Sequence, residues 1–90
     1  MLYMVIERFK HSDPLPVYRR FRDQGRLAPE GLQYASSWVT SDFTTCYQLM
    51  ESDERRLLDA WIERWRDLVD FDVVEVMSSE RAFELVQPRL

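Results

Sequence analysis

The chain has 90 residues, of which 46% are hydrophobic and 31% are charged, and its formal net charge is −4. This length supports one modest hydrophobic core, so we expect a single domain over residues 1–90. No apolar run approaches the roughly eighteen residues of a membrane span, and the N-terminal apolar stretch is too short for a signal peptide. Because Cys46 is the only cysteine, no internal disulfide can form. These features predict a cytoplasmic bacterial protein without a membrane partner.

Residues 2–9, LYMVIERF, are predicted as the first strand. They are rich in β-forming side chains and apolar at both alternating sets of positions, which is typical of a strand covered on both faces. A helix is predicted to begin at Ser12 or Asp13, either of which can cap it, with Pro14 in its first turn. Gly25 can end the regular part of this helix.

Residues 31–40 and 44–51 are predicted as the two strands of a hairpin, with a turn at residues 41–43. Simple alternation places four side chains of the first of these strands on one face: Leu32, Tyr34, Ser36 and Trp38. Ser52 or Asp53 then caps a second helix. At about 100° per residue, its apolar side chains share one arc, comprising Leu57, Leu58, Trp61, Ile62, Trp65, Leu68 and Val69.

Trp61 and Trp65 lie near the centre of that apolar arc. We expect them first as core residues, since each indole buries a large area. The alternative is that they form the wall of a ligand pocket, because large apolar pockets are lined by such rings. In either case each indole N–H requires a hydrogen-bond acceptor, which a ligand or a trapped water could supply.

Residues 71–77, FDVVEVM, are predicted as the last strand, and residues 78–86 as a short C-terminal helix. The resulting order β-α-β-β-α-β is that of the ferredoxin-like fold, of the α+β class. In this fold a four-stranded antiparallel sheet carries two helices on one face, and right-handed crossovers place the first and third strands at its centre.

The sheet face turned away from the helices is predicted to be too apolar to remain in water. The first strand is apolar on both sides, and the third presents Tyr47 and Leu49 on one side and Cys46 and Met50 on the other. Exposed apolar surface of this kind costs about 25 cal/mol per Å². We therefore expect a homodimer with the two sheets face to face, which is the dimeric α/β-barrel arrangement.

Several short motifs resemble those of a bacterial family of about 90 residues known only as a domain of unknown function. The motifs are LYMV and ERF in the first strand, Pro29-Glu30-Gly31, Trp38, Tyr47, Glu51 and the segment 65–73, WRDLVDFDV. The resemblance spans nearly the whole chain and implies a ferredoxin-like fold of the dimeric α/β-barrel type, without an assigned activity. Glu75 departs from the pattern, because proline is expected there in many relatives.

Glu7, His11 and Tyr47 are the candidate catalytic residues. Glu7 interrupts an apolar strand, where pairing with the third strand could bring it near Tyr47 or Thr45 and burial would raise its pKa. The alternative for Glu7 is a strand-end side chain that leans into solvent. His11 follows the first strand, where a general base could lie, and a surface-loop histidine is the alternative. Cys46 has no base nearby in sequence and is expected as a small buried residue.

Tyr34, Trp38, Trp61 and Trp65 are the candidate ligand-binding residues, for a small apolar or aromatic compound between sheet and helices. Two hypotheses remain open: a protein that only binds such a compound, and a cofactor-free enzyme similar to the monooxygenases and isomerases built on dimeric α/β barrels. One histidine and one cysteine make no metal cluster, and phosphate-loop and RNA-recognition signatures are missing. We therefore expect no metal, no cofactor and no nucleic-acid partner.

Overall fold

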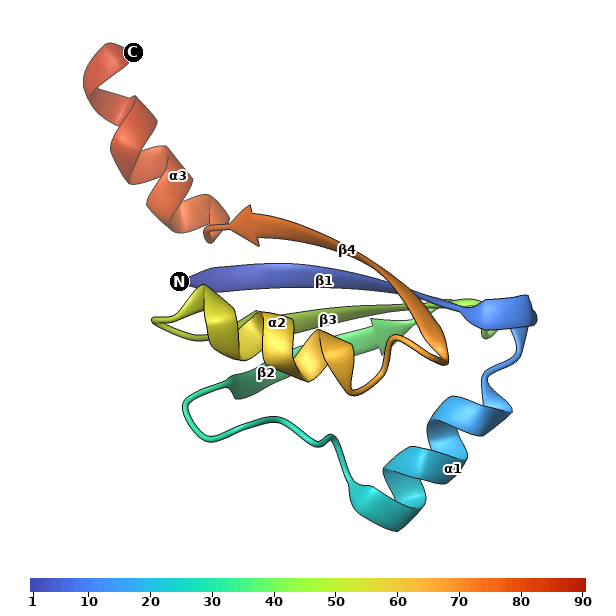
Figure 1. Cartoon of the computed structure of the whole chain (residues 1–90). Coiled ribbons are helices and arrows are strands. Elements are labelled where there is room, and N and C mark those ends of the chain that lie inside the picture. Colours follow the sequence, from blue (N-terminus) through green and yellow to red (C-terminus); the bar gives the residue numbers. More distant parts are fainter.

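The computed structural model describes residues 1–90 as a four-stranded sheet with helices on one side and a projecting C-terminal helix (Figure 1). Its elements are β1 (Leu2–Phe9), η1 (Lys10–Ser12), α1 (Leu15–Gln24), β2 (Gln33–Val39), β3 (Thr45–Glu51), α2 (Arg55–Glu63), β4 (Val69–Val76), α3 (Ser79–Val86) and η2 (Gln87–Arg89). The strands pair antiparallel in the order β2-β3-β1-β4. The predicted ferredoxin-like α+β fold is therefore confirmed. None of the helices combines the length and the apolar character that a membrane crossing requires.

The register of β1 against its neighbours decides which side chains face the helices. Val5 lies opposite Gln48 of β3, and Glu7 lies opposite Cys46 of β3 and Phe71 of β4. Because successive side chains of a strand point to opposite faces, the helix-covered face receives Tyr3, Val5, Glu7 and Phe9, all of them buried. The other face, which we call the open face, receives Leu2, Met4, Ile6 and Arg8.

The strand β2 departs from simple alternation. Its register against β3 shifts between Tyr34 and Ser36, so that Tyr34 pairs with Met50 of the helix-covered face and Ser36 pairs with Leu49 of the open face. The prediction that Tyr34, Ser36 and Trp38 share one face is therefore wrong. An irregularity of this kind adds one residue to the strand and turns the following side chains over.

The core lies between the helix-covered face and α2. Its main cluster consists of eight buried residues: Tyr3, Val5, Leu32, Met50, Leu58, Trp61, Ile62 and Trp65. Trp61 and Trp65 are 1% and 5% exposed, so their predicted place in the core is confirmed. Full burial of an aromatic side chain of this size is a large apolar contribution to folding.

The helix α2 is shorter than its apolar arc predicts. It ends at Glu63, and β4 begins at Val69 rather than at Phe71. Tight turns connect the two, because the Trp65 carbonyl accepts hydrogen bonds from the amides of Leu68 and Val69 over 2.9 and 3.1 Å. Such turns keep side chains near helical directions beyond the helix end, which is why the periodicity continues to residue 69.

The helix α1 lies on the same side of the sheet as α2 but packs less closely (Figure 1). None of its residues is buried, and Tyr18 and Phe21 are each 44% exposed. Its first turn is held by Asp13, whose carboxylate accepts a hydrogen bond from the Leu15 amide. It ends, as predicted, at Gly25, whose φ of 72° is a conformation that glycine adopts without strain.

The C-terminal helix α3 extends away from the sheet (Figure 1). Ser78 caps it by accepting a hydrogen bond from the Arg81 amide. None of its residues is buried, and Phe83, Leu85 and Val86 are each about half exposed. The helix therefore presents an apolar side to solvent that its own domain does not cover.

Candidate functional site

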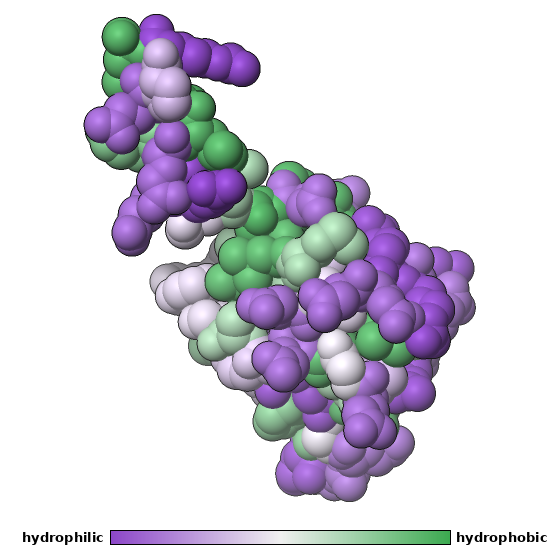
Figure 2. All heavy atoms as spheres, turned by 90° about the vertical axis from the view of Figure 1, so that its left-hand side faces the viewer, coloured by the Kyte–Doolittle hydropathy of each residue, from purple (hydrophilic) through white to green (hydrophobic).

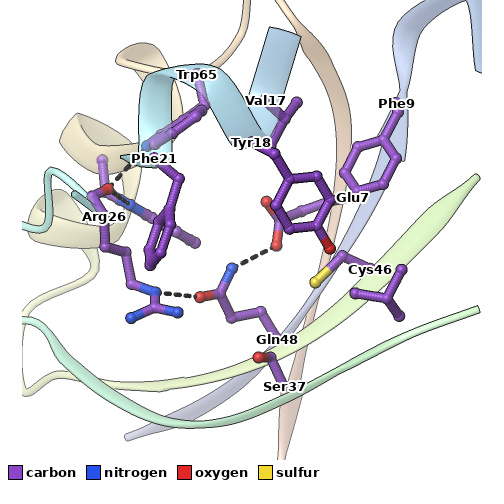
Figure 3. A pocket seen from close by; sticks show the side chains of 12 residues that line it. Glu7, Phe9, Val17, Tyr18, Phe21, Arg26, Ser37, Cys46, Gln48 and Trp65 are labelled. Atoms are coloured by element: carbon purple, nitrogen blue, oxygen red, sulfur yellow. Dashed lines mark hydrogen bonds between the residues drawn. The ribbon is translucent and has the colours of Figure 1, made fainter. Parts of the chain in front are cut away.

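A cavity of about 210 Å³ lies between α1 and the helix-covered face of the sheet (Figure 3). Eight of its twelve lining residues are hydrophobic. The lining residues are Glu7, Phe9, Val17, Tyr18, Phe21, Arg26, Ser37, Val39, Cys46, Gln48, Trp61 and Trp65. This volume is below that of a typical site for a drug-sized ligand and suits a compound built on about one aromatic ring. The cavity exists because α1 does not press its apolar side chains against the strands.

Three polar side chains form a hydrogen-bonded chain along one wall of the cavity (Figure 3). Gln48 Nε2 donates to Glu7 Oε2 over 2.6 Å, and Arg26 Nε donates to Gln48 Oε1 over 2.6 Å. Glu7 and Gln48 are 5% and 6% exposed. Each partner therefore satisfies a buried polar group that would otherwise destabilise the fold.

Glu7 is the acid–base candidate of the cavity. Burial raises the pKa of Glu7 to about 7, although the hydrogen bonds with Gln48 and Cys46 and the charge of Arg26 act in the opposite direction. Loss of hydration dominates because the carboxylate form has more solvation to lose than the neutral acid. A carboxyl group with a pKa near neutrality can both give and take a proton at neutral pH.

Cys46 and Tyr18 lie beside Glu7 (Figure 3). Burial, followed by the charge of Glu7 and the hydrogen bond with it, raises the pKa of Cys46 to about 12. Burial, followed by the nearby Cys46 and Glu7, also raises the pKa of Tyr18. Both groups therefore keep their protons at neutral pH, where they can donate hydrogen bonds, and the Cys46 thiol is a poor nucleophile.

The loop after α1 is fastened to the end of α2 through Arg26. The Arg26 carbonyl oxygen accepts hydrogen bonds from Trp61 Nε1 and Trp65 Nε1, both over 2.9 Å. The Arg26 guanidinium lies 3.7 Å from the centre of the Tyr34 ring and 5.3 Å from that of Phe21. The protein itself thus supplies the acceptors that both indoles require, so the two tryptophans offer a ligand their ring surfaces.

A second, wider depression of about 450 Å³ lies between α2 and β4. It is lined mostly by exposed charged side chains, two of which, Arg55 and Asp59, form an ion pair. Its charged side chains are exposed and already form ion pairs, whereas the cavity under α1 contains the buried polar side chains of Glu7 and Gln48. We therefore take the cavity under α1 as the candidate site.

A family model described as Domain of unknown function (DUF3303) matches residues 1–90. The chain belongs to this family. No curated protein and no solved structure matches it. The resemblance to a domain of unknown function is thus confirmed.

Of the four predicted ligand-binding residues of the DUF3303 chain, Trp61 and Trp65 line the cavity. Tyr34 lies next to it, beneath the Arg26 guanidinium. Trp38 lies elsewhere: it pairs with Tyr47 on the open face and is 56% exposed. The register shift in β2 separates Tyr34 from Trp38.

Of the three candidate catalytic residues, only Glu7 lines the cavity. The expectation that Glu7 approaches Tyr47 or Thr45 is wrong, because the register places it opposite Cys46 and sends Tyr47 to the open face opposite Ile6. Its burial also excludes the alternative of a glutamate that leans into solvent. His11 is exposed in η1, where its φ is 60°, outside the cavity.

Sequence analysis missed several residues of the site, including Tyr18, Phe21, Arg26 and Gln48. Gln48 left a signal, because it is a polar residue between the apolar Cys46 and Met50 at alternate strand positions. Arg26 left none, since it lies in a loop and reaches the cavity only through the tertiary fold. No group of three His, Cys, Asp or Glu side chains comes together as a metal site.

Proposed function

We propose that this DUF3303 domain binds a small apolar or aromatic compound in the cavity under α1. The observation that carries the proposal is the buried Glu7–Gln48 pair in the wall of a mainly apolar cavity. Two apolar side chains would fill this space with less desolvation of polar groups. A polar pair at such a position fits a site in which Glu7 or Gln48 forms a hydrogen bond with a ligand.

The protonation states of the wall favour a ligand with an acceptor oxygen. Cys46 and Tyr18 have raised pKa values, and Glu7 has a pKa of about 7, so below neutral pH all three carry a proton. Tyr18 and protonated Glu7 can therefore donate a hydrogen bond to a carbonyl or hydroxyl oxygen, while the Cys46 thiol is bonded to Glu7. Phe9, Phe21 and the two indoles supply the ring surfaces around it.

Binding is tested with benzamide by the indole N–H signals in ¹⁵N–¹H NMR spectra. The chain has three tryptophans, of which Trp61 and Trp65 line the cavity and Trp38 lies on the open face. Benzamide is expected to shift the indole signals of Trp61 and Trp65 with a Kd of about 1 mM, which is typical of a fragment of one ring. The indole signal of Trp38 should not shift. Equal movement of all three, or none at about 10 mM, would contradict the proposal.

Two neighbouring serines provide a matched pair of variants. Ser37 lines the cavity, whereas Ser36 pairs with Leu49 on the open face. Ser37→Leu fills part of the cavity and is expected to weaken benzamide binding about tenfold, while Ser36→Leu leaves it unchanged.

The pKa of Glu7 favours a second function, that of a cofactor-free enzyme. A carboxyl with a pKa of about 7, beside the proton donors Tyr18 and Cys46, suits proton transfer at a carbon next to a carbonyl group. Phenylacetone, a neutral enolisable aromatic ketone, is expected to incorporate deuterium from D₂O faster with the protein than without it. Glu7→Gln should abolish the gain, and an unchanged rate in that variant would exclude this role.

We further propose a homodimer through the open face. Around its centre this face carries the apolar side chains of Met4, Ile6, Leu49, Tyr47 and Val74, and Val74 is 50% exposed. Hydrophobic side chains also gather on one side of α3 and on the part of the domain next to it (Figure 2). A lone helix of eight residues is marginal in water, so α3 gains from a partner surface as well. A second copy supplies both contacts through one self-complementary interface.

Sedimentation velocity at micromolar concentration tests the assembly. The protein is expected to sediment as a dimer, and Met4→Asp, at the centre of the open face, is expected to give the monomer. Arg19→Asp, on the exposed side of α1, serves as the charge-change control. A monomeric parent protein would overturn the homodimer without touching the ligand proposal.

A further inference from the structure

Arg26 is a partly buried arginine that carries no ion pair. The chain forms nine salt bridges, and none includes Arg26. Its one side-chain hydrogen bond runs from Nε to Gln48, so the two terminal guanidinium nitrogens have no acceptor in the protein. In Figure 3 these nitrogens lie at the end of the side chain, beyond the Nε atom that bonds Gln48, and Arg26 is one of the residues that line the cavity.

The position of this guanidinium is fixed in advance of any ligand. Its backbone is held by two indole hydrogen bonds to the Arg26 carbonyl oxygen. Its planar head is stacked on Tyr34 and flanked by Phe21. A long flexible side chain normally loses conformational entropy when it binds a ligand. The Arg26 side chain is already ordered in the folded protein, so binding costs it little further entropy. The result is a preorganised fork of two free N–H-bearing nitrogens beside an apolar cavity.

We infer that Arg26 binds the anionic oxygen group of the cavity ligand, which makes that ligand a small aromatic carboxylate. The inference rests on the proposed function and adds the chemical class of the ligand. A carboxylate matches the spacing of two guanidinium nitrogens, and such charge-assisted bonds are about twice as strong as neutral ones. The aromatic part then occupies the space between Phe21, Trp61 and Trp65.

The other ionisable groups around Arg26 determine the pH range in which a carboxylate can bind there. Tyr18 of α1 and Cys46 of β3 remain neutral because their pKa values are raised, and Gln48 carries no charge. Glu7 of β1 is neutral below its pKa of about 7 and negative above it. Arg20, which lies over Trp65, is already paired with Asp67. An incoming carboxylate is therefore attracted by Arg26 alone in mild acid and repelled by Glu7 in mild alkali.

The test compares benzoate with benzamide, which have the same shape and differ in charge. At about pH 6, where Glu7 is mostly protonated, benzoate is expected to shift the Trp61 and Trp65 signals with about tenfold lower Kd than benzamide. Arg26→Gln should raise the Kd of benzoate about tenfold and that of benzamide much less, because only benzoate forms a charge-assisted bond with the guanidinium. The Arg26 carbonyl that anchors both indoles survives this substitution, so unmoved indole signals in the free variant show that the site is intact.

Arg22→Gln is the control, because Arg22 is exposed on α1 and pairs with Asp23 outside the cavity. It should leave both Kd values unchanged. At about pH 8, where Glu7 is ionised, benzoate binding should weaken more than benzamide binding, because the Glu7 carboxylate repels only the charged ligand. Benzamide binding without any preference for benzoate, or benzoate binding unaffected by Arg26→Gln, would overturn the inference and leave the proposed function standing. Failure of both compounds to bind would overturn the two together.

Discussion

Replacing Glu7 with glutamine is expected to leave the stability of the domain unchanged below about pH 4.5 and to increase it progressively up to neutral pH and above. Burial raises the pKa of Glu7 from the ordinary 4.5 to about 7 in the folded chain. The folded state therefore holds this proton more tightly than the unfolded state. The stability that the proton contributes is fully present below about pH 4.5 and is lost as the pH rises through the folded pKa of about 7.

The size of the effect follows from the two pKa values. At about 1.4 kcal/mol per pH unit, the difference between 4.5 and about 7 corresponds to about 3 kcal/mol of unfolding free energy. Solvent screening reduces this little, because Glu7 is 5% exposed. Glutamine keeps an oxygen for the hydrogen bond from Gln48 Nε2, so the substitution removes the charge and retains the bond.

Urea unfolding followed by tryptophan fluorescence, from about pH 4.5 to about pH 8, measures the effect. The unfolding free energy of Glu7→Gln minus that of the parent protein should grow from near zero to about 3 kcal/mol over this interval. Glu51→Gln, at an exposed strand position, should show no such growth. A difference that stays constant with pH would mean that Glu7 titrates alike in both states, and the reasoning about its burial would fail.

Two further substitutions test the packing around the site. Trp65→Phe removes the indole hydrogen bond to the Arg26 carbonyl and is expected to lower the unfolding free energy by about 1–2 kcal/mol in urea titrations. The control Trp38→Phe, at an exposed position, should change it by less than about 0.5 kcal/mol. Equal losses in the two variants would contradict the assignment of the two indoles. Gly31→Ala should cost about 1–3 kcal/mol, because Gly31 has a φ of 92° and an added Cβ would lie 2.9 Å from Leu57 Cδ1. A neutral Gly31→Ala in thermal unfolding would show that the loop adapts.

Most of the fold could be predicted from the sequence, because each strand and helix has its own period of apolar residues. Residues 2–9 match β1 from end to end, and the order of elements alone selects the sheet topology. The boundary between α2 and β4 could not be placed, since the turns at residues 64–68 keep the helical period. The face of the sheet on which Trp38 lies could not be predicted either, because the alternation of side chains in β2 gives no sign of the register shift.

The site was predictable only at a few residues that are conspicuous in their own segment. Glu7 stands out in an apolar strand, and Trp61 and Trp65 stand out on an apolar arc. Arg26 and Tyr18 break no pattern, because an arginine in a loop and a tyrosine on a helix are ordinary there. Their role depends on how far α1 stands from the sheet, which is a property of the packed structure and of no single segment.

The distance of α1 from the sheet has a cause in the strands beneath it. Under α2 the sheet presents apolar side chains such as Tyr3 and Met50, whereas under α1 it presents Glu7 and Gln48. A helix pressed onto that pair would leave the remaining polar atoms without partners, so the cavity and the reduced stability at high pH have the same origin. The double variant Glu7→Leu with Gln48→Leu is accordingly expected to gain about 1–3 kcal/mol of unfolding free energy at about pH 8 and to lose benzamide binding. If urea titrations and NMR instead show that stability falls together with binding, the pair supports the fold and does not hold the cavity open.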